Sequence, residues 1–76
     1  MSELVEFLAR RLVDDADAVR VEREEREDAL VLHLHVAPED VGKVIGRQGR
    51  IARALRAVVR AAGVREGRRV ILEIAG

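Results

Sequence analysis

Two glycines near the middle of the chain constrain its fold more than any other feature. They begin and end the turn Gly-Arg-Gln-Gly at residues 46–49, which lies between helical patterns at about 38–45 and 50–62. Glycine lacks the side chain that keeps another backbone at a distance. Basic residues flank the turn, and the helix after it offers free N–H groups at its start. The turn therefore suits a phosphate chain, although two glycines at this spacing also occur by chance in small helical proteins.

The helix predicted for residues 50–62 has two contrasting faces. At 100° per residue, one face is apolar and consists of Ile51, Ala54, Leu55, Val58, Val59 and Ala62. The opposite face consists of Arg50, Arg53, Arg56 and Arg60. An ordinary solvated face would account for the arginines, but it would not account for the absence of any acidic residue among them. Gly63 is predicted to end this helix as its C′ residue.

The formal net charge of zero conceals a segregation of charge along the chain. Residues 1–42 carry five arginines and twelve acidic residues, a sum of −7. Residues 43–76 carry nine basic and two acidic residues, a sum of +7. Such segregation creates a local positive field in a neutral protein. The alternative is that it serves solubility or head-to-tail association.

The remaining periodicities complete an α-β-β-α-α-β order in one small α+β domain, residues 1–76. They predict a helix at 3–14 and strands at 18–25, 29–36 and 69–75. A strand, two helices and a returning strand form a right-handed crossover, so the last two strands should be parallel. The hairpin makes the first strand antiparallel to the second. We therefore expect a mixed three-stranded sheet with the helices on one face.

Composition argues against catalysis and against a bound cofactor. The chain has no Cys, Thr, Tyr, Trp or Asn, and its one serine, Ser2, lies at the start, so no nucleophile is held against a base. A P-loop would need glycine at position 37 and Ser or Thr at 44, but these positions are Ala37 and Val44. His33 and His35 could chelate a metal in principle, but without a third ligand a structural role on the surface is favoured.

The chain is expected to be cytoplasmic and to have no membrane partner. No apolar run approaches the ~20 residues that span a bilayer. The first residues lack the basic and apolar regions of a signal peptide.

The layout resembles the type II, prokaryotic KH domain over the whole chain. The block Val-Ala-Pro-Glu-Asp-Val-Gly-Lys-Val-Ile-Gly-Arg-Gln-Gly-Arg-Ile-Ala-Arg-Ala-Leu-Arg at 36–56 is very similar to the bacterial KhpA family of small single-KH proteins. The resemblance implies a cytoplasmic RNA-binding protein that forms homodimers and pairs with a larger KH protein, KhpB. It also implies an RNA chaperone or post-transcriptional regulator with links to cell-wall homeostasis and cell length.

The resemblance also assigns residues. The family's phosphate-clamping loop corresponds to Gly46, Arg47, Gln48 and Gly49, and its groove-lining aliphatic residues to Val44, Ile45, Ile51 and Leu55. The segment 14–17 lacks a proline that relatives often have there. This difference affects only the expected geometry of the local turn.

These residues suggest how RNA would bind. The loop would let about four nucleotides of single-stranded RNA run close to the backbone, and the helix start would add N–H donors and a positive dipole. The phosphates would be neutralised by Lys43, Arg47 and Arg50, with Arg53 on the cationic face behind them. Because the only aromatic residue is Phe7, the ~1–3 kcal/mol per base that stacking supplies is missing. We therefore expect weak binding with little sequence preference.

Two further expectations concern association. A chain this short buries only ~60% of its unfolded surface, and the helices at 3–14 and 50–62 have more apolar positions than the sheet can cover. Val31 and Ile71 also face away from the helices. These features predict a homodimer, which would offset weak binding by raising the effective concentration. The alternative function is a KH-fold protein–protein interaction module, which an acidic or bulky apolar residue in the loop would have favoured.

Overall fold

The computed structural model describes residues 1–75, and its element order is the one expected from the sequence. The helices and strands are α1 (Ser2–Leu12), β1 (Arg20–Glu25), β2 (Leu30–His35), α2 (Val41–Ile45), α3 (Arg50–Arg65) and β3 (Val70–Ala75). Short 3₁₀ turns precede β1, α2 and α3, at Ala16–Ala18, Pro38–Asp40 and Arg47–Gly49. Within the described residues, no helix is both long and apolar enough to cross a bilayer.

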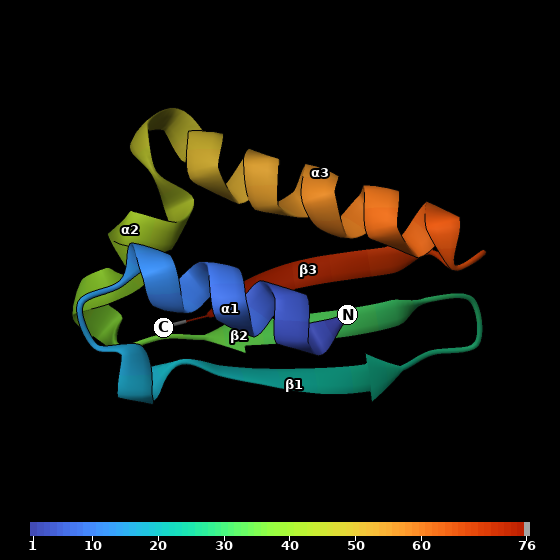
Figure 1. Ribbon diagram of the computed structural model, residues 1–76, viewed down its shortest axis with the longest axis horizontal. Helices are drawn as coiled ribbons and strands as arrows, with labels where there is room; N and C mark the ends of the chain where they lie inside the picture. The colour runs from blue at the N-terminus through green and yellow to red at the C-terminus, as the bar shows by residue number, and fades with distance from the viewer. Residues whose placement is uncertain (76) are drawn as a thin grey trace.

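The sheet confirms the predicted topology. Its order is β1-β2-β3, with β1 antiparallel and β3 parallel to β2. In register, Val21 lies opposite Leu34, and Leu32 lies opposite Leu72. Figure 1 shows α1 in front of β2 and α3 running along β3, with the chain passing in opposite directions through the two long helices.

The core lies between the helices and the inner face of the sheet. It is aliphatic, and its most deeply buried large side chains on the inner face of β2 are Leu32 and Leu34. From α1 they meet Val5 and Ala9, and from the later elements Val44, Leu55, Val59 and Leu72. The alternation of apolar residues in β2 thus predicted the correct inner face.

The outer face of β2 differs from the expectation at one residue. Val31 does face away from the helices, but it is fully buried. It lies between Glu24 of β1 and Ile71 of β3. Because β2 is the central strand, the residues on both neighbouring strands cover the short side chain of Val31. Val31 therefore offers no surface to a second chain, and the expectation that it would do so is wrong.

The end of α3 also differs from the prediction. Gly63 is not the residue after the helix, because α3 continues to Arg65 and Gly63 is buried within it. A Cβ at this position would lie 2.5 Å from the carbonyl oxygen of Arg68 and 2.8 Å from Cγ2 of Val70. Gly63 therefore lets the chain return closely against the helix. The turn that follows contains Gly67 at φ +70°.

The buried face of α3 is rotated relative to the predicted one. Ala52, Leu55, Val59 and Gly63 are buried, whereas Ala54 and Val58 of the predicted apolar face are exposed. The helix thus keeps part of its apolar surface outside the core.

Candidate nucleic-acid interface

The turn at residues 46–49 has an unusual backbone. Gly46 (φ +77°, ψ 171°), Gln48 (φ +58°) and Gly49 (φ +74°) all have positive φ values. Gly49 N–H donates to the carbonyl of Gly46 over 3.1 Å. A positive φ is uncommon for a residue with a side chain, so the conformation of Gln48 is a local strain of the kind that binding loops retain.

The two glycines are needed for different reasons. A Cβ on Gly46 would lie 2.7 Å from Cγ1 and 2.9 Å from the backbone nitrogen of Ile51, so the packing of the protein itself requires glycine there. A Cβ on Gly49 would meet only Nη1 of Arg53, at 3.8 Å. A ligand can therefore come close to the backbone at Gly49, whereas at Gly46 the protein's own Ile51 fills that space.

The turn opens onto the start of the 16-residue helix α3. Arg47 and Gln48 are exposed, and Figure 1 shows the turn at one end of the molecule, clear of the sheet. Gly49 is the N-cap residue, and no side chain of residues 1–75 caps the helix. The first N–H groups of α3 thus lack side-chain acceptors, and the positive end of the helix dipole lies beside them.

The arginines near this turn differ from those elsewhere in their pairing. In the first half of the chain, Arg10, Arg20, Arg23 and Arg26 each form an ion pair with a glutamate. Within the described residues, none of the six arginines of the turn and α3 has a carboxylate partner, namely Arg47, Arg50, Arg53, Arg56, Arg60 and Arg65. The positive charge predicted from the sequence therefore remains uncompensated around α3.

Lys43 is placed differently from these arginines. Its Nζ lies 3.2 Å from Oδ1 of Asp40 and 3.3 Å from Oδ2 of Asp14. The hydrogen bond to Asp40, joined by that to Asp14, raises the pKa of Lys43. Asp40 is only 3% exposed, and its Oδ2 accepts the Asp15 N–H over 3.0 Å. That hydrogen bond, with the Lys43 ammonium, lowers the pKa of Asp40.

Lys43 thus ties α2 to the segment after α1, and its charge is already balanced by two carboxylates. Part of this arrangement could have been found in the sequence, because Asp40 and Lys43 are three residues apart at the start of a helical turn. The contact with Asp14 is a tertiary one that periodicity does not reveal.

The four aliphatic residues assigned to a groove do not share one environment. Val44 is fully buried and Leu55 is 6% exposed, so both belong to the core. Ile45 and Ile51 are half-buried and keep some surface near the turn.

The two sides of α3 carry different surfaces. On the side of β3, Arg56 Nε donates to the carbonyl of Leu72 over 3.3 Å. On the side of α1, a mostly apolar groove of about 490 Å³ is lined by Phe7, Leu8, Leu12, Ile51, Ala54, Leu55 and Val58, with Arg11 and Arg50 at its edge.

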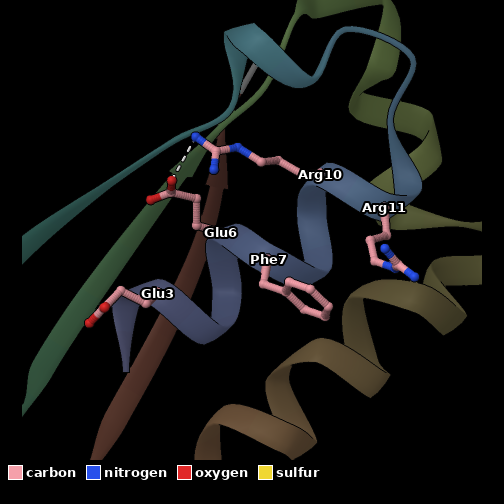
Figure 2. A pocket seen from close by; sticks show the side chains of 5 residues that line it. All are labelled: Glu3, Glu6, Phe7, Arg10 and Arg11. Carbon is pink, nitrogen blue, oxygen red and sulfur yellow. Dashed lines mark ion pairs between the residues drawn. The ribbon is translucent and has the colours of Figure 1, made fainter.

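Phe7 is the most conspicuous residue of that groove, since its side chain is 57% exposed. Figure 2 shows Phe7 and Arg11 on the side of α1 that faces α3, while Glu6 and Arg10 pair on the other side at 2.7 Å. The Arg11 guanidinium carbon lies 5.2 Å from the centre of the Phe7 ring, within cation–π range.

The two histidines lie on the open face of the sheet and contact glutamates of β1. His33 Nε2 lies 2.8 Å from Oε1 of Glu24, and His35 Nε2 lies 2.6 Å from Oε1 of Glu22. Hydrogen bonds from Arg26 and then from His33 lower the pKa of Glu24 to about 2. Across residues 1–75, no three His, Asp or Glu side chains are arranged to hold a metal ion. These pairs fit the structural role that the sequence favoured.

Comparison with known proteins agrees with this fold over nearly the whole chain. A family model described as "KhpA/KhpB, KH domain" matches residues 2–74. A protein of Clostridium acetobutylicum and one of Caldanaerobacter subterraneus subsp. tengcongensis are each 53% identical over 74 residues, which cover 97% of this chain and 99% of each relative. A Bacillus subtilis relative is 45% identical over 97% of this chain and 91% of its own length.

All three relatives are named "RNA-binding protein KhpA", which agrees with the non-enzymatic role predicted from the composition. The α+β fold and the predicted family resemblance are both confirmed by the match. The chain belongs to the KhpA/KhpB family of KH-domain proteins.

Proposed function

We propose that this protein binds single-stranded RNA by clamping the phosphate backbone at residues 46–49. The observation that carries the proposal is the glycine turn, which opens onto an uncapped helix start beside arginines that have no carboxylate partner among residues 1–75. The names of the relatives support the same class of ligand. A KH loop of this type holds about four nucleotides.

The residues of the clamp have distinct roles in this proposal. The N–H groups at the start of α3 and the exposed Arg47 contact phosphates, and Arg50 and Arg53 extend the positive surface along the helix. Ile45 and Ile51 offer the partly exposed aliphatic surface against which bases rest. Lys43 acts indirectly, because its ion pairs with Asp14 and Asp40 position α2 before the turn.

Salt dependence tests whether the arginine face contacts phosphates. For single strands, log K falls with log salt by ~0.7 for each phosphate contact. We expect Arg53→Gln to reduce that slope by about 0.7 and to weaken RNAs of different sequence to a similar degree. Arg23→Gln, which removes a charge paired with Glu25 on β1, should leave the slope unchanged. A flat salt response of the wild-type protein would show that the arginines are merely solvated.

We further propose that the protein forms a homodimer through the apolar groove between α1 and α3. Phe7 and Val58 are 57% and 43% exposed there, a large apolar surface for a small domain. The groove lies on the opposite side of α3 from the contact of Arg56 with β3. Association through the groove would place Arg50, which also lines it, beside the interface, and would leave Arg56 and Arg60 on the side of β3 open to RNA.

Light scattering at micromolar concentration tests the dimer. The wild-type protein should show twice the monomer mass of 8.5 kDa, and the double variant Phe7→Glu/Val58→Glu should show the monomer mass. Val64→Glu is the control, since Val64 is 72% exposed but does not line the groove. A wild-type mass near 8.5 kDa at every concentration would contradict the homodimer.

The wider role follows from the family resemblance. We propose that the protein acts in the cytoplasm as an RNA chaperone or post-transcriptional regulator, pairs with a KhpB-like larger KH protein, and affects cell-wall homeostasis and cell length. The apolar groove also supports the alternative of a protein–protein interaction module. In that case the protein would associate with a partner but fail to bind single-stranded RNA.

A further inference from the structure

Asp40, the residue before α2, is the one charged residue among residues 1–75 that is buried, with 3% of its surface exposed. Its two carboxylate oxygens have different partners. Oδ2 accepts the backbone N–H of Asp15 over 3.0 Å, and Oδ1 accepts a hydrogen bond from Nζ of Lys43 over 3.2 Å. Burial of a carboxylate is costly unless such partners satisfy it. Asp40 therefore joins the start of α2 to the segment after α1, across 25 residues of sequence.

This junction matters because α2 is too short to hold a position of its own. It has five residues, and an isolated helix of that length is not stable in water, so tertiary contacts must place it. Val44 holds the middle of α2 in the core, where it is fully buried. Asp40 is the N-cap residue and holds its start, and Gly46, the C-cap residue, begins the turn. The direction in which the chain enters the turn thus depends on both contacts.

The two contacts of Asp40 require a carboxylate rather than any polar side chain of the same size. Both oxygens face donors, so an asparagine would have to turn its NH₂ group against the Asp15 N–H or against the Lys43 ammonium. The hydrogen bond from Asp15, joined by that from Lys43, lowers the pKa of Asp40, which keeps the group ionised. An amide at this position would therefore leave one contact broken although its shape is nearly the same.

We propose that Asp40 is a positioning residue of the clamp, which sets the direction of the turn at 46–49 through its hydrogen bond to the Asp15 N–H. The inference rests on the proposed function and adds to it a buried residue that does not touch RNA. Lys43 supports the contact as the counter-ion of Asp40, since its side chain is 43% exposed and that of Asp40 only 4%. RNA affinity thus depends on the backbone of the segment after α1.

The sign of the effect of Asp40→Asn on RNA affinity tests this role. The variant removes a negative charge, so by charge alone it should bind a short oligouridine more tightly. If Asp40 positions the turn, it should bind about tenfold more weakly, because an unpaired buried donor favours a displaced α2 by about that factor. The salt slope should stay as in the wild-type protein, because no phosphate contact is lost. Fluorescence anisotropy at several salt concentrations measures both quantities.

Rescue by a second substitution separates positioning from a general loss of packing. In Asp40→Asn/Lys43→Met, the amide oxygen can accept the Asp15 N–H without placing its NH₂ group against an ammonium. This double variant has the net charge of the wild-type protein and should recover most of the affinity. Lys43→Met alone should keep the wild-type salt slope, whereas a direct phosphate contact of Lys43 would lower it by ~0.7.

Hydrogen exchange in the wild-type protein tests the same coupling without any substitution. Coupling between two sites is reciprocal, so RNA held at the turn should slow exchange of the Asp15 amide by the same factor of about ten. The Arg26 amide, which donates to the carbonyl of Ala29 in the hairpin, is the control and should exchange at an unchanged rate. This measurement decides the matter even if Asp40→Asn does not fold.

Val5→Ala is the control for a loss of stability, since Val5 is fully buried on α1. It should lower Tm and leave RNA affinity unchanged at a temperature where the protein is folded. If folded Asp40→Asn binds RNA as tightly as the wild-type protein, if the double variant binds no better than Asp40→Asn, or if RNA leaves exchange at Asp15 unchanged, Asp40 does not position the turn and the clamp stands. If the wild-type protein does not bind the RNA, the proposed function is wrong and this inference fails with it.

Discussion

Replacing Arg47 and Gln48 together by aspartate is expected to abolish binding to single-stranded RNA while the protein stays folded. The change removes one cation and places two carboxylates where phosphates would lie. Hydrogen bonds to charged groups contribute about 1.5–3 kcal/mol, so even before repulsion the loss exceeds tenfold in affinity. Fluorescence anisotropy with a labelled short RNA measures the loss.

The fold should survive this double substitution for two reasons. Both side chains are exposed, and Asp tolerates the left-handed conformation of residue 48 better than most residues. Val64→Asp/Arg65→Asp is a matched control with the same change in charge on exposed residues of the last turn of α3. Wild-type affinity in the loop variant, with an unchanged circular dichroism spectrum, would rule out the clamp.

Gly46→Ala is expected to have a large effect on stability. Gly46 has φ +77° and ψ 171°, a region that is nearly exclusive to glycine and costs other residues about 1–3 kcal/mol. The added methyl would also meet Ile51 at 2.7–2.9 Å, and overpacking costs a further ~1 kcal/mol or more. We therefore expect a loss of about 2–4 kcal/mol. For a domain of this size, that is a decrease in Tm of about 10 °C or more.

Gly49→Ala is the natural comparison for Gly46→Ala. Gly49 also has a positive φ, but a methyl there meets nothing closer than 3.8 Å. The loss should be about 1 kcal/mol, or a Tm lower by about 4–8 °C. Thermal unfolding followed by circular dichroism measures both variants. Equal decreases in Tm would contradict the view that Gly46 is required by its packing against Ile51.

The sequence predicted best the features that depend on the pattern within one element or on the order of elements along the chain. The alternation of Leu30, Leu32 and Leu34 predicted the inner face of β2, and the crossover rule predicted that β3 is parallel to it. The glycine spacing located the turn at residues 46–49. These features depend on local periodicity and chain topology, which a single sequence records.

Tertiary contacts explain the predictions that were wrong or incomplete. Gly63 was predicted to be the C′ residue of its helix. It lies within α3 instead, where the absence of a side chain lets Arg68 and Val70 pack closely against the helix. Lys43 was predicted to contact phosphates, and the sequence did not reveal that Asp14, 29 residues earlier, lies 3.3 Å from its Nζ. Val58 matched the apolar face of its helix but was left exposed, because α1 and α3 do not close the groove between them.

The arrangement of α3 links the proposed RNA site to the proposed dimer. One side of the helix presents Arg56 and Arg60 toward β3, and the other presents Ala54 and Val58 toward α1, while Arg50 and Ile51 border both the groove and the turn. A single helix can therefore serve RNA and protein contacts at once. This division explains why uncompensated charge and exposed apolar surface both occur on a chain of 76 residues.

The most direct test of the central claim is to map the RNA contact residue by residue. Backbone amide NMR spectra of the ¹⁵N-labelled protein would be recorded during titration with a short single-stranded RNA. We predict that the largest shift changes occur at residues 46–53, with the amides of Gly49 and Arg50 foremost, and that Phe7 and Val58 change little. Changes concentrated at Phe7, Leu12 and Val58 of the α1–α3 groove, or none at residues 46–50 at saturating RNA, would contradict the clamp.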